Sequence, residues 1–332
     1  MNVNPMIKKF VDVITNIKRT NLNEQLFPKY IMIVLNHQNR VIDEKEINSY
    51  KKRVFSTIKN FKLVEKGDKI FVAVSGGKDS TAALILLKEY IEENNINAEI
   101  YAYHINLGFG YSNKLQEDVE KIADKVGVKL FVTNVKEEYG IDIVKASKIL
   151  KRPICSICGL VKRYLMNKVP RELGATKLAT GHHAMDFLIN YFKNILNNNY
   201  EWNLKILPKL KSEHPKLLTK IRPLIFTFPE ENKMYCEYKE VPITSISCPY
   251  SPNFCCYLTK SQDSKLFELL NFSDRIMKDF RLNFIKSIVR MNKKLTKEQN
   301  SKEKYKECKI CGEVTNLDIC AFCKIRNLFS NQ

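Results

Sequence analysis

An apolar run, a short loop with two glycines and a helix-forming segment follow one another near residue 75. This succession restricts the possible folds more than any other feature. The run KIFVAV (69–74) has the β-branched composition of a buried strand. The segment STAALILLKEYIEE (80–93) has the apolar spacing of a helix. Together they predict one strand–loop–helix unit of an α/β sheet. The loop consists of Ser75, Gly76, Gly77, Lys78, Asp79 and Ser80.

The loop has the composition of a phosphate-binding loop. Glycines let backbone N–H groups approach an anion, and the start of the next helix carries a partial positive charge. Ser75 and Ser80 can donate hydroxyl hydrogen bonds, and Lys78 adds a positive charge. The Asp79 carboxylate is expected to cap the helix or to hold Mg²⁺. The loop is not a Walker motif, because GxxxxGK[ST] is absent. A tight turn without a ligand is the alternative.

Strand and helix patterns alternate from residue 69 to residue 196, which predicts a doubly wound parallel sheet with right-handed crossovers. One or two amphipathic helices are expected over 265–291. The other expected strands are 99–106, 128–135 and 177–180, and the other expected helices are 114–127, a segment from Pro153 to about Leu173, and 184–196.

Charge and cysteine usage narrow the function classes. The 332 residues hold 55 Lys and Arg against 36 Asp and Glu, a net charge of +19 that favours polyanionic partners such as RNA or DNA. A composition rich in Lys, Asn and Ile without functional meaning is the alternative. No run approaches 18 apolar residues, and MNVNPMIKKF lacks the apolar core of a secretory signal. We therefore expect a cytoplasmic protein without a membrane segment, in which ten clustered cysteines are more often metal ligands than disulfides.

Two CxxC pairs near the end of the chain are separated by eight residues. Four thiolates in two such pairs suit a tetrahedral zinc ion. A module this small buries little core, so metal binding would drive its folding. The expected zinc ligands are Cys308, Cys311, Cys320 and Cys323.

A third CxxC pair stands at the start of an expected helix. Cys155, Cys158 and Lys162 have the i, i+3, i+7 spacing that places two thiols and an ammonium on one helix face. Cys248 is a candidate third thiolate, and three thiolates on a four-iron cluster leave one iron open. The residues alone leave half of a zinc site, or inert buried thiols, as alternatives. The remaining cysteines are expected to be structural: Cys236, Cys255 and Cys256.

The motif SGGKDS after an apolar strand resembles the signature of the PP-loop ATP pyrophosphatase superfamily, whose members cleave ATP between the α and β phosphates and adenylate a substrate. From about residue 30 onward the chain is similar to the TtcA/TtuA family of tRNA 2-thiolation enzymes. The segments that carry this similarity are LGFGYS (107–112), KEEYGI (136–141), PICSICGLVKRYLM (153–166), LATGHHAMDF (178–187), IRPLIF (221–226) and SCPYS (247–251).

The resemblance implies a tRNA sulfurtransferase that uses ATP to adenylate the C2 carbonyl of a pyrimidine and then replaces its oxygen by sulfur. It implies a [4Fe–4S] cluster on Cys155, Cys158 and Cys248, and it matches Lys162 and Asp186 to the family's catalytic pair. The implied cofactors are ATP, Mg²⁺, the cluster and Zn²⁺. The implied partners are tRNA, a sulfur source (free sulfide or a ubiquitin-like carrier) and a second copy of the chain.

The chain departs from the family pattern in two places. Acids that commonly flank the position of Asp186 are replaced by Met185 and Phe187, which makes a weakened or altered enzyme conceivable. The family's N-terminal zinc finger has no counterpart, because FPKYIMIVLNHQ (27–38) contains no cysteine. Two further residues near expected strand ends, His104 and Gly181, are expected to contact adenosine or phosphate.

Four segments are expected: a helical basic lobe (1–66), a PP-loop catalytic domain (67–260), a helical segment with a linker (261–302) and a zinc ribbon (303–332). Two other functions remain open from the sequence. One is a PP-loop ligase, such as a lysidine synthetase, which needs no cluster. The other is a non-catalytic RNA-binding paralogue that keeps only the ribbon and the basic lobe.

Overall fold

The computed structural model describes residues 43–212, 214–250, 262–298 and 305–329. Most of the expected N-terminal lobe, including 27–38, lies outside the described residues, as do Cys255 and Cys256. The chain contacts gather Glu44–Gln332 into one compact unit. The finer division into four segments stays a proposal.

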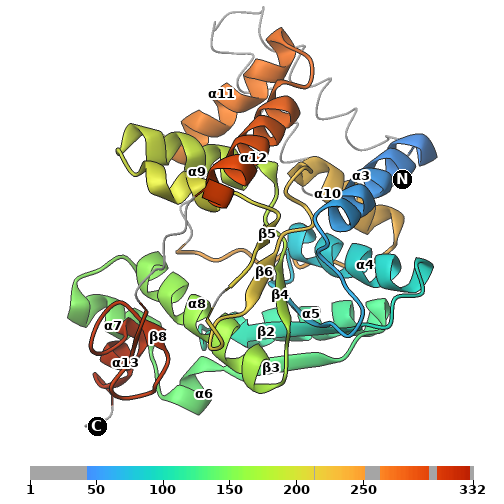
Figure 1. Ribbon diagram of the computed structural model, residues 1–332. Coiled ribbons are helices and arrows are strands. Elements are labelled where there is room, and N and C mark those ends of the chain that lie inside the picture. Colours follow the sequence, from blue (N-terminus) through green and yellow to red (C-terminus); the bar gives the residue numbers. More distant parts are fainter. Residues whose placement is uncertain (1–42, 213, 251–261, 299–304, 330–332) are drawn as a thin grey trace, which may run out of the picture. The chain divides into compact units, whose positions relative to one another are not determined.

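The centre of this unit is a six-stranded sheet with the order β3-β2-β1-β4-β6-β5 (Figure 1). All neighbouring pairs are parallel except β5 and β6, which pair antiparallel at one edge. This arrangement confirms the expected α/β fold with a mostly parallel sheet. The strands are β1 (Lys69–Ala73), β2 (Glu99–Asn106), β3 (Leu130–Asn134), β4 (Lys177–Thr180), β5 (Lys209–Leu210) and β6 (Thr219–Ile221).

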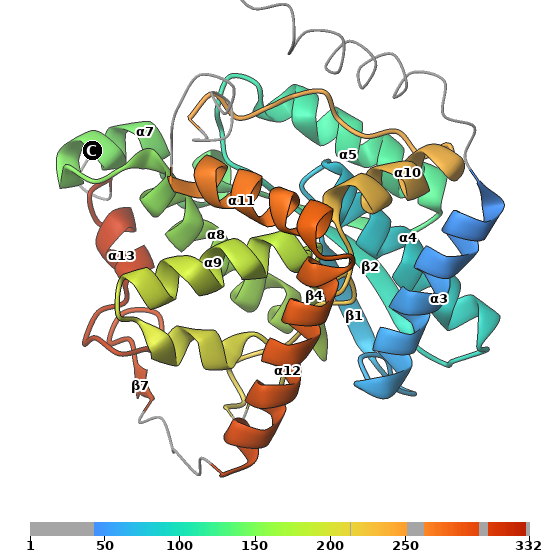
Figure 2. The same cartoon turned by 90° about the horizontal axis from the view of Figure 1, so that it is seen from above.

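Helices lie on both faces of the sheet (Figure 2). On one face, α4 contacts β1, β2 and β4, and α5 contacts β2 and α4. On the other face, α8 places Met166 and Val169 against a cluster that contains Phe71 and Leu178. The helices up to this point are α3 (Glu44–Asn60), α4 (Lys78–Glu93), α5 (Ser112–Val126), α6 (Val135–Tyr139), α7 (Ile143–Leu150) and α8 (Ile154–Glu172).

The sequence explains why the central unit forms. The middle of β1 is completely buried at Ile70, Phe71 and Val72, as expected of a strand covered on both faces. Helix α4 buries ten of its residues beneath the sheet. Within the described part of the chain, no helix is long and apolar enough to cross a membrane.

A second apolar cluster joins α9 to α11 and α12. It includes Met185 and Phe187, which are 1% and 7% exposed. The positions that flank Asp186 therefore serve the packing of these helices, which an acid could not do without a partner. The remaining elements in this part are α9 (Ala184–Leu196), the 3₁₀ helix η1 (Tyr200–Lys205), α10 (Pro229–Tyr238), α11 (Gln262–Ile276) and α12 (Phe280–Glu298).

The C-terminal module consists of β7 (Lys306–Glu307), β8 (Val314–Thr315) and α13 (Ala321–Arg326), and it packs against α8. The ring of Phe322 stacks on Tyr164 with centroids 3.8 Å apart. Arg171 donates hydrogen bonds of 2.8 and 2.6 Å to the two carboxylate oxygens of Glu313. Helix α8 is thus fixed to the sheet on one side and to the C-terminal module on another.

Candidate functional site

The loop after β1 is closed by its own hydrogen bonds. The Ser80 hydroxyl donates to the Gly77 carbonyl over 3.0 Å and accepts the Ser75 N–H over 3.1 Å. Gly76 has φ +84°, and an added Cβ would lie 3.1 Å from side-chain atoms of Leu115 and Thr244. The position therefore requires glycine for both conformation and space. The loop leads directly into α4, whose first-turn N–H groups are free to face an anion.

Gly181 lies against the start of α4. A Cβ at this position would lie 2.6 Å from the backbone of Asp79 and from the Ser80 nitrogen. The carboxyl end of β4 can approach the phosphate loop this closely only because residue 181 has no side chain.

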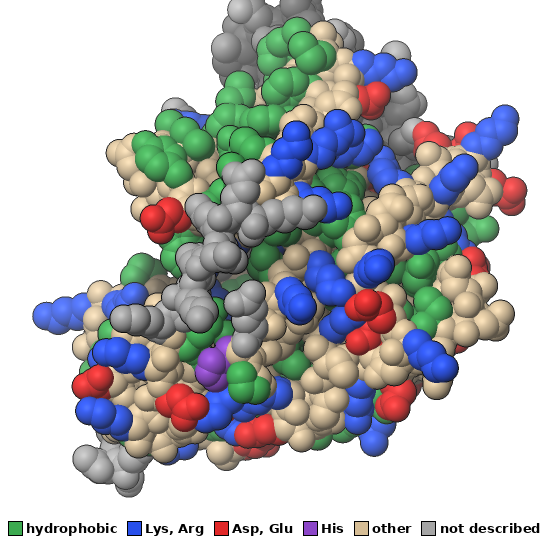
Figure 3. Space-filling model, viewed as in Figure 1, with side chains coloured by type: hydrophobic (Ala, Val, Ile, Leu, Met, Phe, Trp, Pro, Cys, Tyr) green, Lys and Arg blue, Asp and Glu red, His purple; other side chains and the backbone are tan. Residues whose placement is uncertain are grey.

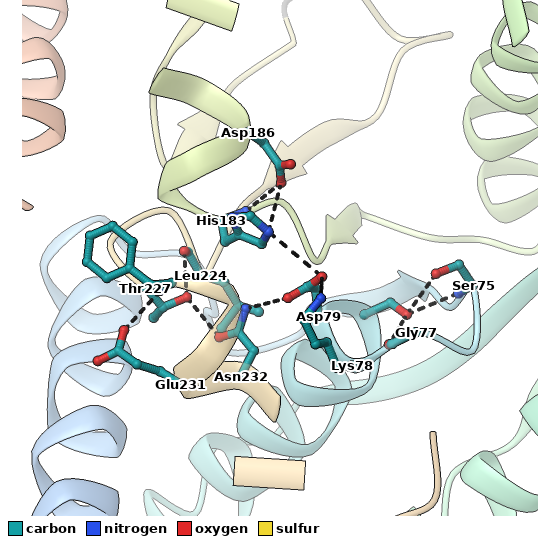
Figure 4. A network of polar contacts seen from close by, with 12 residues as sticks. Ser75, Gly77, Lys78, Asp79, His183, Asp186, Leu224, Thr227, Glu231 and Asn232 are labelled. Carbon is teal, nitrogen blue, oxygen red and sulfur yellow. Dashed lines mark hydrogen bonds and ion pairs between the residues drawn. The ribbon is translucent and has the colours of Figure 1, made fainter. Parts of the chain in front are cut away.

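Asp79 lies at the centre of a polar network (Figure 4). Its Oδ1 accepts a 2.8 Å hydrogen bond from Asn232, and its Oδ2 lies 3.1 Å from the Lys78 ammonium. Asn232 is completely buried, and its Oδ1 accepts hydrogen bonds from Tyr50 and Thr227. The carboxylate is thereby held in one orientation from the side of α10.

His183 stands between Asp79 and Asp186 in the same network. Its Nε2 lies 3.8 Å from Asp79 Oδ2 and 3.7 Å from Asp186 Oδ2. Asp186 also accepts a 3.0 Å hydrogen bond from the His183 N–H, which caps the start of α9. Asp186 is therefore connected to the phosphate loop through the His183 imidazole.

A cavity of about 240 Å³ opens at the carboxyl ends of β1 and β2. Ser75 of the phosphate loop lines it, together with Lys162, Cys158 and Cys248. Asp186 does not line it, so the structure does not bring Lys162 and Asp186 together in this cavity. The loop and two of the three expected cluster cysteines share one space.

His104 contributes an unpaired nitrogen to this cavity. Its ring is 2% exposed, and Nδ1 lies 2.8 Å from the Val74 carbonyl, which can only accept. Nδ1 therefore carries the proton, and Nε2 is a buried acceptor with no partner among the described residues. Burial, with a smaller contribution from Lys162, lowers the pKa of His104, so the ring is neutral near pH 7. A ligand that donates a hydrogen bond would satisfy Nε2.

The three expected cluster cysteines come from two elements, and two of them, Cys158 and Cys248, line the cavity. Cys155 and Cys158 lie in the first turns of α8, and Cys248 lies in the irregular segment 241–248. Burial raises the pKa of Cys158, and the Lys162 ammonium opposes this shift. Cys155 is exposed and lies 3.1 Å from the Tyr250 carbonyl. Thiolates that each hold a different iron must leave room for the inorganic core, and a cavity between them is what such a cluster needs.

The segment that carries Cys248 is also attached to the phosphate loop. The Thr244 N–H donates to the Gly76 carbonyl over 2.9 Å, and the Thr244 hydroxyl donates to Asp118 over 2.7 Å. Ile246 and Cys248 then line the cavity. One short stretch of chain thus contacts the loop and carries one of the expected cluster cysteines.

The C-terminal cysteines form a tighter group. Their four sulfur atoms lie within 4.8 Å of one another, and those of Cys311 and Cys320 are 3.7 Å apart. Two sulfurs at corners of a zinc tetrahedron lie about 3.8 Å apart, given Zn–S bonds of about 2.3 Å. Although burial acts to raise it, backbone N–H donors lower the pKa of Cys308 to about 6, which favours its thiolate. The four residues fit one metal ion.

The sequence did not point to Asn232 or Thr244. Both act on the loop from more than 150 residues away, and nothing in their local sequence distinguishes them. By contrast, the sequence did point to Ser75, Cys158, Lys162 and Cys248, which line one cavity.

The comparison with protein families bears on the whole catalytic unit. The profile of the PP-loop domain matches residues 46–242. The chain belongs to the PP-loop family. The resemblance expected from the loop is therefore confirmed, and the matched range contains every strand of the central sheet.

Relatives of this PP-loop protein point to one group within the family. The chain is 34% identical over 297 residues to the tRNA-5-methyluridine(54) 2-sulfurtransferase of Thermotoga maritima, covering 89% of this chain and 92% of that protein. It is 34% identical over 226 residues to the tRNA-cytidine(32) 2-sulfurtransferase of Tolumonas auensis, covering 68% and 70%. The structure of the U34-tRNA thiolase NcsA from Methanococcus maripaludis with its [4Fe-4S] cluster matches with a TM-score of 0.69 and 25% identity, covering 86% and 88%.

Proposed function

We propose that this PP-loop protein is a tRNA 2-sulfurtransferase. It would adenylate the C2 carbonyl of a pyrimidine with ATP and then replace the activated oxygen by sulfur. The observation that carries this proposal is the shared cavity, in which the phosphate loop meets Lys162, Cys158 and Cys248. The named activities of the relatives support the same reaction.

The first half of the reaction belongs to the loop. The ATP phosphates would lie at the start of α4, where backbone N–H groups, Ser75 and Lys78 stabilise their charge. The C2 oxygen attacks the α phosphorus, and pyrophosphate leaves. His104 Nε2 can accept a hydrogen bond from the nucleotide, and Asp79, fixed by Asn232, is the carboxylate that could hold Mg²⁺.

The second half belongs to the cysteine side of the cavity. A four-iron cluster held by Cys155, Cys158 and Cys248 would supply an iron with an open position for sulfur. Lys162 places a positive charge in the cavity, where it can orient an anionic sulfur toward C2. Sulfur bonds to C2, the C2–O bond breaks, and AMP leaves with that oxygen. Asp186 would act on the loop side, through His183, by holding or accepting a proton.

The partners of this reaction follow from its chemistry. A folded tRNA must expose the base, because a 240 Å³ cavity admits a single nucleotide and not a duplex. The C-terminal ribbon would hold Zn²⁺ as a structural ion. Free sulfide or a ubiquitin-like carrier, a homodimer and a cytoplasmic location complete the proposal.

The test is an anaerobic reaction of the cluster-loaded protein with unmodified tRNA, ATP and sulfide. Mass spectrometry of the nucleosides should find a 2-thiopyrimidine, with one AMP and one pyrophosphate formed for each sulfur transferred. ATP turnover without a thionucleoside in a colourless protein would instead favour a PP-loop ligase without a cluster. The absence of both would favour an RNA-binding paralogue.

A lysine pair on α8 gives a matched control. Lys162→Ala should abolish thiolation, because the charge inside the cavity is lost. Lys168→Ala on the same helix should retain activity, because Lys168 pairs with Glu172 outside the cavity. Equal activity of the two variants would contradict the role given to Lys162.

A further inference from the structure

Three cations at the carboxyl end of β6 have no carboxylate partner. No carboxylate oxygen of the described residues lies within 4.0 Å of a side-chain nitrogen of Arg163, Lys220 or Arg222. Other cations around the same sheet edge are paired: Lys177 with Asp68 at 2.6 Å, Lys209 with Glu65 at 2.8 Å, and Lys216 with Glu307 at 2.8 Å. Lys220 and Arg222 thus differ from these paired neighbours, and both are also partly removed from water.

The strand register brings these cations together. Lys220 pairs with Leu178 across β6 and β4, so both side chains leave the sheet on the same face. Leu178 packs against Met166 of α8, and Arg163 precedes Met166 by three residues on that helix. Arg163 and Lys220 thus face each other across the space between α8 and β6. Arg222 follows the end of β6, and its charge acts on Lys220.

Arg222 is held in place by neutral groups. Its Nη1 donates hydrogen bonds of 2.7 and 3.0 Å to the carbonyls of Lys205 and Leu207, and its guanidinium lies 4.9 Å above the Phe187 ring. These contacts orient the group without neutralising its charge. Figure 3 shows Lys and Arg side chains gathered around the middle of one face, with few Asp and Glu side chains among them.

The surroundings of Lys220 and Arg222 favour an anionic ligand. Burial lowers the pKa of Lys220, and the charges of Arg222, Arg163 and Lys205 lower it further. Burial alone lowers the pKa of Arg222 to about 10. Cations that are partly removed from water beside one another destabilise the fold until a counter-charge arrives.

We propose that Arg163, Lys220 and Arg222 form a seat for a phosphodiester of the RNA backbone, next to the nucleotide whose base enters the cavity. The proposal rests on the proposed function, because it names how the tRNA is held. Guanidinium groups suit the paired oxygens of a phosphate, and Lys220 adds a point charge.

The position of the seat favours RNA over the phosphates of ATP. ATP has its own anion site at the start of α4, after β1. Strand β6 lies two strands from β1, which is about 10 Å at a strand spacing of about 4.8 Å. Arg163 is exposed, so the seat is open to a large ligand. It also adjoins the cavity, because Lys162 and Met166 on either side of Arg163 line that cavity.

The test measures binding of full-length tRNA to the metal-loaded protein at several salt concentrations. Lys220→Gln is expected to weaken binding roughly 3- to 10-fold and to reduce the slope of log affinity against log salt by about 0.7 to 0.9, since one phosphate contact is lost. Arg163→Gln should act similarly. Lys220→Arg should restore both values, and the affinity for ATP should stay unchanged.

Lys233→Gln on α10 is the matched control, because Lys233 is exposed and pairs only within its helix with Glu237. A Lys220→Gln variant that loses no more affinity than this control would overturn the seat. A variant that loses ATP affinity and keeps its tRNA affinity would reassign the seat to the nucleotide. If the wild-type chain binds no tRNA, both the seat and the proposed function are overturned. If the wild type thiolates tRNA and Lys220→Gln binds tRNA as tightly as the wild type, the seat alone is overturned.

Discussion

The two cysteine centres of the molecule are built in opposite ways. In the ribbon, four sulfur atoms lie within 4.8 Å of one another, and backbone N–H groups already point at Cys308 and Cys320. At the cavity, the thiols come from a helix start and from a segment without regular structure, and Cys155 is exposed. Four thiols of the ribbon surround one point, whereas the thiols at the cavity border a space that is open on one side.

Under the proposed function, the difference would separate a structural task from a reactive one within a single chain. A closed set of four thiolates leaves a metal ion no position for chemistry, and a set of three leaves one. Helix α8 belongs to both centres, because Cys158 lies at one end and Tyr164 and Arg171 contact the ribbon further along. Four substitutions measure what the two centres contribute to metal binding, thiolation and stability.

The largest effect is expected at the cavity. Cys158→Ser should remove the iron and lower thiolation at least about 100-fold, because even groups behind a metal ligand contribute about 10- to 100-fold. Zinc should remain at one ion per chain, which elemental analysis measures beside the thiolation assay. Cys236→Ser is the control, since that buried thiol only donates to the Lys78 carbonyl. If Cys158→Ser keeps its full iron content, the cysteines at the cavity do not hold a cluster, and the contrast with the ribbon fails.

The next effect concerns the ribbon. Cys323→Ser should lose the zinc ion and the folded ribbon, because a module of this size depends on its metal. Thiolation should fall only about 10-fold, the scale of a small displacement of a reacting group, as α8 loses support on one side. Metal analysis and thermal unfolding check this. Retention of zinc by the variant would show that the four thiols do not act as one site.

A smaller effect is expected where the ribbon docks. Glu313→Gln should lower the free energy of unfolding by about 2 kcal/mol, because the half-buried Arg171 loses a bidentate carboxylate. Both metals should stay bound. Asp318→Asn, which breaks an exposed pair with Lys309 in the same module, should cost less than about 0.5 kcal/mol. Equal losses in urea unfolding would mean that the Arg171 pair does not hold the ribbon to α8.

The smallest effect is a pH dependence of the free energy of unfolding that arises from His104 in the cavity. The folded pKa of His104 lies below its unfolded value of about 6.5, so its contribution to stability is complete above that pH and is lost as protons bind the unfolded chain. Between pH 6.5 and 5.5 the loss should be at most about 1 kcal/mol, the limit that protonation of the unfolded chain alone would set. His104→Gln should remove this part, and His214→Gln, near Tyr305 of the C-terminal part, should not. The readout is the difference in unfolding free energy between each variant and the wild type at the two pH values.

The local sequence pattern was sufficient to predict the strands and helices at the centre of the fold. The expected strand at 99–106 and the expected helix at 184–196 agree with β2 and α9 residue for residue, because one is a compact run of β-forming residues and the other has apolar residues at helical spacing. Strands β5 and β6 have two and three residues, too few for any period to show, and the sequence did not predict them. The cations of the phosphodiester seat could not be found for the same reason, since only the register of β6 aligns Lys220 with α8.

The candidate site also has one part that the sequence predicted and one part that it did not. Ser75–Ser80 and the CxxC pair are compact motifs, and a few adjacent residues are enough to predict their chemistry. Asn232 reaches Asp79 across 153 positions, and its function depends on how α10 packs against α4. The resemblance matched Asp186 to a catalytic role, but the sequence did not show that the capping of α9 places its carboxylate next to His183. Relations of this kind arise from packing and leave no trace in a short stretch of sequence.

The link from Thr244 to Cys248 has a consequence for timing. Because the Thr244 N–H is bonded to the Gly76 carbonyl, the phosphate loop is in direct contact with the backbone that leads to Cys248. Under the proposed function, a loop that shifts when ATP binds would carry this backbone with it, so the two halves of the reaction would share one moving part.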